Sequence, residues 1–363
     1  MKNNIRNLFL SIGLSSLFST ASAAVLCVNN STNGPAAYTD ITVAMAAASN
    51  NDTLFISGSI NSYGDILISK PLTFIGAGAN PQKQIPYSTI VGNVNMANGL
   101  NNVRVKGLII NGYFNLGYGA TNFDMEYCYF MNSHFQLNNN CSNIRISSCI
   151  FANVNNGANR NIDGFDYCGG YYTSTTNLLI QNCIFNGAIS GLNIPGTLIQ
   201  NNIFLSNVPA FYGVNVYNNG GCYTTSYINN ASIQNNIFYR ADPLAYTSGC
   251  AFSNNISYSS STTFGNMPGT GNLDNIDSQF INFPAAGDYF SYAYDFHLGS
   301  SSPGHNAGTD GKDIGVYGGT FATSLFGEVN NVPVLRQVIV TNPNIAPNGN
   351  INVKVRSTIA RTN

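Results

Sequence analysis

The sequence is short of charged side chains. Lysine, arginine, aspartate and glutamate make up 8% of its 363 residues, against roughly 25% in a typical soluble domain. The formal net charge is −1, so the sequence predicts no basic surface for nucleic acid or for an anionic membrane. Asn, Ser, Thr and Gly take the place of the charges, and this mixture suits stacked strands, in which like charges above one another would repel.

Long apolar runs are confined to the N-terminus. Lys2 and Arg6 precede an apolar stretch at 8–18, and Ala21, Ser22 and Ala23 form a small-residue cleavage site, which is the pattern of a signal peptide. Residues 1–23 are therefore predicted to be removed by cleavage before Ala24. No later segment approaches the roughly 20 apolar residues of a membrane-spanning helix. We expect a secreted protein without a transmembrane segment in its mature chain, located extracellularly, at the cell surface or in the periplasm.

The sequence has no CxxC pair, and its three histidines are scattered, with His134 standing alone. A zinc site is therefore not expected. Eight cysteines in an exported protein permit disulfides but do not assign them. Two arrangements are open for the repeat cysteines, either a disulfide or a stack of buried thiols, and the cysteines concerned are Cys128, Cys149 and Cys183. Cys168 and Cys222 lie in two long turns and could bridge them.

Self-similarity is the strongest signal that is present. A motif of strand, two-residue bend and strand recurs at Val105–Ile110, Met125–Phe130, Ile146–Phe151, Ile180–Phe185, Ile199–Phe204, Ile233–Phe238 and Phe252–Ser257. Its fourth positions are spaced by 20, 21, 34, 19, 34 and 19 residues. Short turns of the chain thus alternate with turns that carry an insert, which gives a duplicated 53-residue unit.

Alternation along each strand sends every second side chain inward. Stacked coils then predict an inward column of phenylalanines at 130, 151, 185, 204 and 238, and an inward amide ladder of Asn202, Asn236 and Asn255. Asn and Gly fall at the bend, where they tolerate a left-handed backbone. In the same register Arg104, Asp124 and Arg145 form one outward column of alternating charge, as a parallel ladder favours.

The repeats and the flanking segments resemble the pectin-lyase-like β-helix superfamily. An amphipathic helix at 38–48 and the strands at 51–56 and 70–76 look like the first coils of that family, and 295–318 resembles the closing segment of its bacterial members. The resemblance implies an all-β fold, a right-handed parallel β-helix (a solenoid) with an N-terminal capping helix. It implies little about activity, because this fold carries lyases, hydrolases, adhesins and non-catalytic proteins.

The sequence thus predicts a β-helix over residues 24–327, followed by a change of character at 328–363. Val338 and Val340, then Val353 and Val355, alternate on either side of a Pro-Asn-Gly turn. This pattern predicts a C-terminal β-hairpin that covers the unpaired edge of the last coil. A sorting or anchoring tail is the alternative.

Two inserts, at 153–177 and 207–230, are the expected places for a binding surface, since long turns on a rigid coil commonly carry one. Tyrosine rings with asparagine amides suit sugars, and the candidate ligand-binding residues are Tyr167, Tyr171, Tyr172, Tyr212, Tyr217, Tyr223 and Tyr227. The alternative is that these tyrosines pack the inserts onto the coil.

The sequence does not show the active-site residue patterns that are usual in the resembled family. No lysine lies between Lys106 and Lys312, although lyases of this fold typically use a lysine or arginine base with calcium-binding carboxylates. The weak catalytic candidates are Arg160, Asp163, Asp166, Arg240 and Asp242. Asp163 and Asp166 are also weak Ca²⁺ candidates, and no other cofactor is expected. Turn formation is the alternative for these aspartates.

An apolar stripe is predicted on the outside of the coil. It consists of Tyr129, Ile150, Ile184, Ile203, Ile237 and Ile256. The inserts or the hairpin could cover it, or it could serve for self-association through Ile150, Ile184, Ile203 and Ile237.

The sequence favours an exported, non-catalytic β-helix protein that binds a glycan or another cell-surface component through its inserts. The alternatives are a polysaccharide lyase or glycoside hydrolase, and a self-associating structural surface protein. No nucleic-acid partner is expected.

Overall fold

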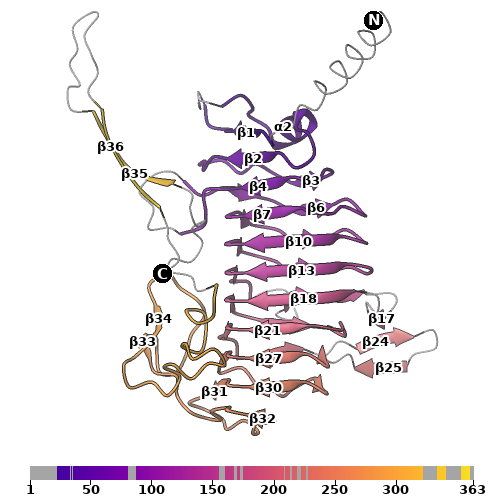
Figure 1. Cartoon of the computed structure of the whole chain (residues 1–363), viewed down its shortest axis with the longest axis vertical. Helices are drawn as coiled ribbons and strands as arrows, with labels where there is room; N and C mark the ends of the chain where they lie inside the picture. Colours follow the sequence, from indigo (N-terminus) through magenta and orange to yellow (C-terminus); the bar gives the residue numbers. More distant parts are fainter. Residues whose placement is uncertain are drawn as a thin grey trace, which may run out of the picture.

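The computed structural model describes residues 23–321, apart from 33, 35, 81–86, 155–159, 167–169, 172–174, 208, 213–214, 219–221 and 226–227, together with 333–340 and 353–359. Residues 1–22 of the predicted signal peptide therefore lie outside the described residues. The chain winds through three long parallel sheets, which we name A, B and C, in the order A, C, B within each coil. The result is a right-handed parallel β-helix (Figure 1), as the repeats predict.

Sheet A has eleven strands, namely β1 (Val25–Val28), β2 (Thr53–Ile56), β4 (Thr73–Ile75), β7 (Arg104–Lys106), β10 (Thr121–Glu126), β13 (Ser142–Ser147), β18 (Thr176–Gln181), β21 (Leu198–Gln200), β27 (Ser232–Gln234), β30 (Ala251–Ser253) and β32 (Gly269–Thr270). Sheet C has eight, namely β5 (Ile90–Val91), β8 (Ile109–Ile110), β11 (Tyr129–Phe130), β14 (Ile150–Phe151), β19 (Ile184–Phe185), β22 (Ile203–Phe204), β28 (Ile237–Tyr239) and β31 (Ile256–Tyr258). Sheet B has seven, namely β3 (Ile66–Ile68), β6 (Val94–Met96), β9 (Phe114–Asn115), β12 (Phe135–Gln136), β15 (Arg160–Asp163), β20 (Ala188–Ser190) and β23 (Phe211–Tyr212).

Five further strand pairs lie outside these sheets. They are β16 (Phe165–Asp166) with β17 (Gly170–Tyr171), β24 (Asn215–Asn218) with β25 (Cys222–Thr225), β26 (Ile228–Asn229) with β29 (Thr247–Ser248), β33 (Phe280–Asn282) with β34 (Asp295–Leu298), and β35 (Pro333–Val340) with β36 (Val353–Ile359). All are antiparallel except β26 with β29.

The strand register confirms the repeat spacing. Asp124 pairs with Arg104 on one side and with Arg145 on the other, and Arg145 pairs in turn with Leu179. The outward charges form the predicted ladder, because Asp124 lies 3.4 Å from the Arg104 Nε and 2.9 Å from the Arg145 Nε. Arg145 also reaches Glu126 at 2.7 Å.

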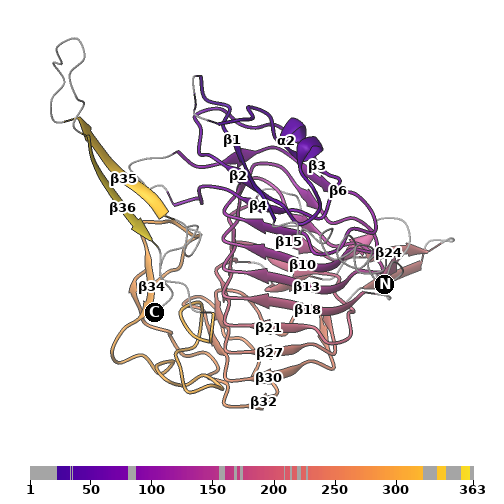
Figure 2. The same cartoon turned by 45° about the horizontal axis from the view of Figure 1, so that its top comes forward.

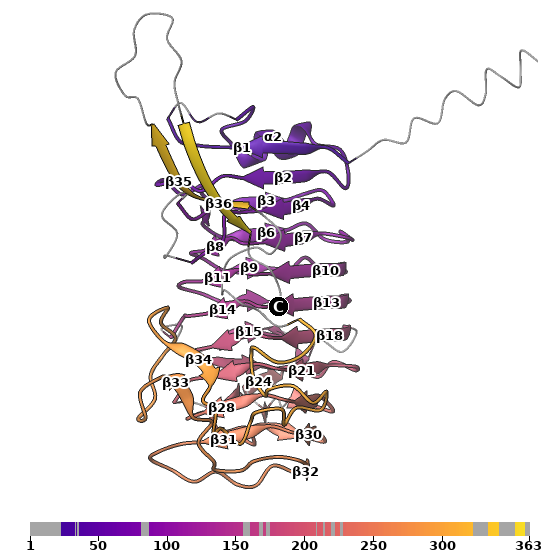
Figure 3. The same ribbon diagram turned by 60° about the vertical axis from the view of Figure 1, so that its left-hand side comes forward.

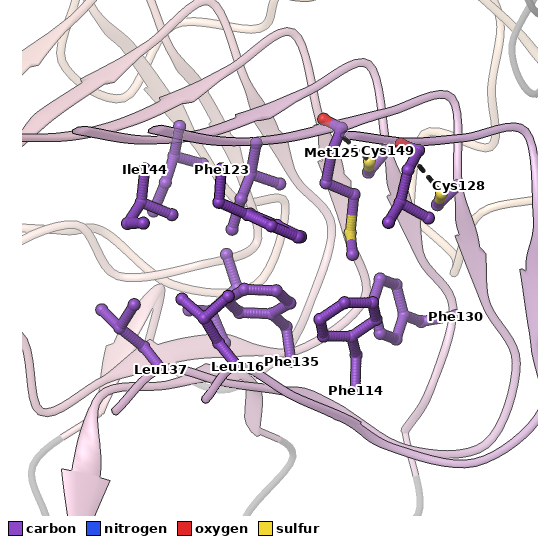
Figure 4. Close-up of a cluster of buried hydrophobic side chains, with 14 of the residues drawn as sticks. Phe114, Leu116, Phe123, Met125, Cys128, Phe130, Phe135, Leu137, Ile144 and Cys149 are labelled. Atoms are coloured by element: carbon purple, nitrogen blue, oxygen red, sulfur yellow. Dashed lines mark hydrogen bonds between the residues drawn. The ribbon is translucent and has the colours of Figure 1, made fainter. Parts of the chain in front are cut away.

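The interior is filled by stacked aromatic rings. The predicted phenylalanine column is confirmed, with successive ring centroids 4.6, 4.9, 4.9 and 5.0 Å apart from Phe130 to Phe238. Figure 4 shows Phe114 between Phe130 and Phe135, with the thiols of Cys128 and Cys149 against the same core. Complete burial of one such ring contributes roughly 1.5–3 kcal/mol, so the column is a main source of stability.

An inward amide ladder lies at the bend between sheets A and C. The Nδ2 of Asn202 donates to the Oδ1 of Asn236 at 2.9 Å, and that of Asn236 donates to the Oδ1 of Asn255 at 3.0 Å. The ladder continues to Asn272, also at 3.0 Å. The predicted ladder is thus confirmed and one rung longer, and it satisfies amides that would otherwise be buried without partners.

A short helix, α2 (Ile41–Ala47), caps the N-terminal end. The Asp40 carboxylate accepts hydrogen bonds from the backbone N–H groups of Thr42 and Val43, which fixes the first turn. The Lys70 Nζ donates to the carbonyls of Ala46 and Ala48 at the other end. The predicted capping helix is confirmed. Strand β1 precedes it and pairs with β2, which the sequence analysis did not foresee.

The isoleucines of the apolar stripe on the outside of sheet C are completely covered, and Tyr129 is partly covered. Ile150, Ile184, Ile203 and Ile237 are each 0% exposed, so the self-association surface expected from them is wrong. They form a second hydrophobic core with residues of the closing segment, which we define as 273–321. Among the described residues, the stripe is covered by the closing segment and by neither the inserts nor the hairpin, which were the two covers expected. Figures 1 and 3 show this segment folded back along one side of the coil.

The bend asparagines hold the closing segment in place. Their side chains donate to backbone carbonyls of that segment, from Asn254 to Ala307 at 2.7 Å and from Asn182 to Val316 at 2.8 Å. Asn235 exchanges two hydrogen bonds of 2.9 Å with Thr309. The same residues have the left-handed backbone that was predicted, with φ of 52° at Asn182 and 57° at Asn235. Asparagine therefore both forms the left-handed bend and binds the closing segment.

The C-terminal hairpin is confirmed by the pairing of Val338 with Val355 and of Val340 with Val353. Its expected position is wrong. In Figures 1 and 3 β35 and β36 lie at the level of the N-terminal coils, whereas β32 forms the opposite end. The hairpin therefore does not cover the last coil, because the closing segment carries the chain back along the stack.

Candidate functional site on sheet B

Each predicted insert contains an ordinary coil strand. β15 (Arg160–Asp163) lies within 153–177, and β23 (Phe211–Tyr212) lies within 207–230. What protrudes is the hairpin β16–β17 after the first of these strands and the hairpin β24–β25 after the second. We call these hairpins the inserts from here on. Arg160 and Asp163 therefore belong to the rigid face of sheet B and not to a loop.

The outer face of sheet B presents a column of polar side chains, one from each of six successive coils. The column runs through Asn95, Asn115, Gln136, Asp163, Ser190 and Tyr212, which are paired in register from strand to strand. Phe135 and Ile162, which alternate with these residues, face the core, so the pleat directs the column outward. Within the column Asp163 and Ser190 are themselves buried. A linear polar face thus passes beside the inserts.

The centre of this column is a buried ion pair. Asp163 accepts from Nη1 of Arg160 on one oxygen and from the Ser190 hydroxyl on the other, at 2.8 Å. The side chain of Arg160 is 12% exposed and that of Asp163 is 5% exposed. The backbone carbonyl of Asp163 also accepts from the Gln136 Nε2 at 3.1 Å. Both carboxylate oxygens are therefore engaged within the protein.

His134 faces the same cluster. Burial lowers the pKa of its imidazole below the ordinary value of 6.5, the charge of Asp163 opposes this shift, and the charge of Arg160 adds to it. The ring donates a hydrogen bond to the Gln136 side chain, which opposes the downward shift, and the Ser133 hydroxyl lies 3.2 Å from Nδ1. The expectation that His134 stands alone is wrong. His134 therefore lies near enough to Arg160 and Asp163 for both charges to act on its pKa.

The N-terminal half of the face is an amide ladder. Asn115 donates through Nδ2 to the Oδ1 of Asn95 at 3.4 Å, and Asn138 donates to the Oδ1 of Asn115 at 2.8 Å. The Tyr113 hydroxyl lies 3.5 Å from the Nδ2 of Asn95. Amides and phenols of this kind offer donors and acceptors without charge, which suits hydroxyl-rich ligands.

The two inserts lie side by side, because β17 contacts β24. Both project from the same edge of the coil in Figure 1. Tyr212 is half-buried at the foot of the second insert, and its ring lies 5.7 Å from that of Tyr246 in the next coil. The remaining predicted ligand-binding tyrosines lie outside the residues whose side chains are described, namely Tyr167, Tyr171, Tyr172, Tyr217, Tyr223 and Tyr227. They stay predictions.

Arg240 is directed toward the closing segment. Its Nη2 donates to the Leu205 carbonyl at 2.8 Å, and its guanidinium lies 5.7 Å from the centre of the Tyr289 ring. Asp242 caps a turn by accepting from the backbone N–H of Leu244 at 2.9 Å. The described contacts of Arg240 and Asp242 are therefore structural.

Metal ligation at Asp163 would require displacing Arg160 or Ser190 from its oxygens. The side chain of Asp166 lies outside the description. Among the described residues, no group of three or more His, Cys, Asp or Glu side chains is arranged to hold a metal ion.

Sequence reasoning missed three residues of this face, namely His134, Gln136 and Ser190. The feature that would have indicated them is the coil strand inside the first insert, which was not recognised in the sequence. Had 160–163 been placed in the repeat frame next to 135–136, the pairing of Gln136 with Asp163 would have followed.

No protein-family model matches the chain, and no curated protein matches it. Similar solved structures include a rhamnogalacturonan lyase, with 12% identity, 77% of this chain and 97% of that one covered, and a TM-score of 0.42. They also include PfbA, a surface adhesin of Streptococcus pneumoniae, with 15% identity, 60% and 69% coverage and a TM-score of 0.37. These likenesses concern the fold alone.

Helices long and apolar enough to cross a membrane are absent from the described part of the chain.

Proposed function

We propose that this chain is an exported β-helix protein that binds a glycan or another cell-surface component without cleaving it. The binding surface consists of the outer face of sheet B and the two inserts beside it. The contact between β17 and β24 carries the proposal, because it joins the inserts into one wall along a polar face. Polar side chains on a rigid sheet beside aromatic rings are suited to sugars, which present apolar C–H faces and hydroxyl rims.

The engagement of the strongest acid–base candidates supports a non-catalytic role. Asp163 is buried and bonded on both oxygens, and Arg240 and Asp242 have structural contacts. A glycosidase needs two carboxyl groups, one as acid and the other as base or nucleophile. Asp163 is the carboxylate of the described polar column, and its oxygens are already committed to Arg160 and Ser190.

The test is a glycan screen with the mature protein that reads binding and products together. The ligands include neutral polysaccharides and polyuronates, with and without calcium, and the products are followed as reducing ends and as unsaturated sugars. We expect saturable binding of at least one glycan and no products. Turnover of any polysaccharide would contradict the proposal, and so would the absence of binding across the screen.

Polysaccharide cleavage is the second candidate function, and the grouping of His134 with Arg160 and Asp163 favours it. Burial lowers the pKa of His134, so the imidazole is neutral at pH 7 and able to accept a proton. If the screen gives products, His134→Gln should abolish them while the protein stays folded. Unchanged turnover in that variant would eliminate this site.

A further inference from the structure

The first strand of the coil begins directly after the cleavage point that the sequence predicts. Cleavage is predicted before Ala24, and β1 starts at Val25. β1 is the terminal strand of sheet A, and among the described strands of that sheet it pairs with β2. Figure 2 brings this end of the coil forward and shows β1 and α2 together there. The start of β1 therefore has few neighbours that could hold it in place.

Ala24 is bound by the turn that leads into β2. Its backbone nitrogen donates to the Oδ1 of Asp52 at 2.7 Å, and its carbonyl accepts from the backbone N–H of Thr53 at 2.8 Å. The second carboxylate oxygen of Asp52, Oδ2, accepts from the backbone N–H of Ser49 at 2.8 Å. One carboxylate thus joins the start of β1 to the segment that follows α2.

Asp52 is a buried carboxylate that lacks a countercharge within the described part of the chain. The residue is 6% exposed, and no described lysine, arginine or histidine forms an ion pair with it. Buried carboxylates are normally paired with a positive charge, because removing an ion from water is costly. The nitrogen that donates to its Oδ1 is the atom that cleavage before Ala24 would turn into a charged group.

We propose that removal of the signal peptide supplies this countercharge and locks the first coil. A signal peptidase hydrolyses the Ala23–Ala24 bond, so the hydroxyl of water goes to the Ala23 carbonyl carbon and its proton to the Ala24 nitrogen. The new acid ionises, and the new amine takes up a proton at neutral pH. Before cleavage this nitrogen has one N–H for Asp52, and afterwards it is an ammonium with three donors and a full charge. Ala23 and Ala24 are both exposed, which leaves the bond accessible.

The position of the cleavage is thereby tied to the fold. An N-terminus one residue earlier or later would move the ammonium by about 3.4 Å along an extended chain, away from the 2.7 Å contact with Asp52. A chain that begins at Ala24 places its charge at that contact. The N-terminal end of the coil is thus completed only after export, and this does not depend on the binding of a glycan.

Two measurements test the proposal. The first is the intact mass of the protein exported from a bacterial host with its own signal peptide, which should match a chain that begins at Ala24. The second compares residues 24–363 with residues 21–363, each released without extra residues from a fusion, because in the longer form the Ala24 nitrogen is again an amide. Hydrogen–deuterium exchange should be about tenfold faster in β1 and β2 of the longer form, since the lost charge lies between an exposed and a buried ion pair. The later coils should exchange equally in both forms.

Asp52→Asn removes the carboxylate charge, so the two forms should then exchange alike. Asp40→Asn is the matched control, because Asp40 also accepts from two backbone N–H groups at this end of the coil. It should loosen α2 equally in both forms and preserve the tenfold ratio. The proposal is overturned if the exported chain begins at another residue, or if the two wild-type forms exchange equally, a comparison that stands even where Asp52→Asn does not fold. A ratio retained in Asp52→Asn also overturns it, because the extra residues and not the ion pair would then loosen β1.

Discussion

Replacing Asp163 by asparagine should destabilise the protein by breaking the buried ion pair at the centre of sheet B. The carboxylate accepts from Arg160 on one oxygen and from Ser190 on the other. An asparagine side chain accepts on one oxygen only, and its NH₂ group then faces one of the two donors. Arg160, with 12% of its side chain exposed, is left with a charge that water reaches poorly.

The expected loss is about 3 kcal/mol in the free energy of unfolding. Removal of one partner of a buried pair typically costs about 3–5 kcal/mol, and the residual exposure of Arg160 places this pair at the lower end. The double variant Arg160→Gln with Asp163→Asn should lose less than the sum of the single losses, because both substitutions break the same ion pair.

Urea unfolding followed by circular dichroism measures these losses. The control is Asp65→Asn, since Asp65 is exposed and accepts from the Asn93 backbone at 2.8 Å. It should cost less than about 1 kcal/mol. If Asp163→Asn is no more destabilising than this control, the pair is hydrated, and the structural role assigned to Asp163 is wrong.

Three further predictions follow from burial. Ile203→Ala should destabilise the protein by about 2–5 kcal/mol in urea unfolding, because Ile203 is 0% exposed beneath the closing segment; a loss below about 0.5 kcal/mol, as at a surface site, would contradict that cover. At pH 8, iodoacetamide followed by mass spectrometry should label exposed Cys27 but not Cys128 or Cys149, since burial raises the pKa of both thiols; their labelling in native protein would refute this. Burial depresses the pKa of folded His134 below 6.5, so the folded state resists protonation of this ring. The contribution of His134 to the free energy of unfolding is therefore fully present above a pH of about 6.5 and is lost as the pH falls through the folded pKa. His134→Gln should weaken this acid dependence, and an NMR titration with a pKa above 6.5 would disprove it.

Much of the coil could be predicted because its information is local and periodic. The spacing of the motif gave the pairing of Arg104 with Asp124 and of Asp124 with Arg145 before any coordinates. The inward amide ladder followed from the same frame, since identical residues at one position of stacked coils must meet.

The closing segment could not be predicted in this way. The hydrogen bonds from Asn182 join it to carbonyls 134 and 136 positions away, and no period links the two partners. The sequence identified the apolar stripe correctly, but both covers expected for it, the inserts and the hairpin, were wrong, since the closing segment covers it. Only packing distinguishes an isoleucine beneath a returning chain from one on a free surface.

Only part of the candidate site could be predicted from the sequence. Arg160 and Asp163 were named as a cluster, but they were placed in a loop because the repeat motif marks only sheets A and C. Sheet B strands are two to four residues long and vary in sequence, from Phe135–Gln136 to Phe211–Tyr212. Their residues come together only once the lengths of the intervening turns are known, and these lengths differ from coil to coil.

The central claim is that glycans bind where the inserts meet sheet B, and the affinity of a tyrosine variant tests it most directly. The measurement is the dissociation constant of the best glycan from the screen for the double variant Tyr212→Ala with Tyr246→Ala. Tyr87→Ala is the control, because Tyr87 is 66% exposed near the N-terminal coils. The account predicts at least about tenfold weaker binding for the double variant, as for loss of an aromatic binding contact, and unchanged binding for the control. Wild-type affinity in the double variant would contradict it.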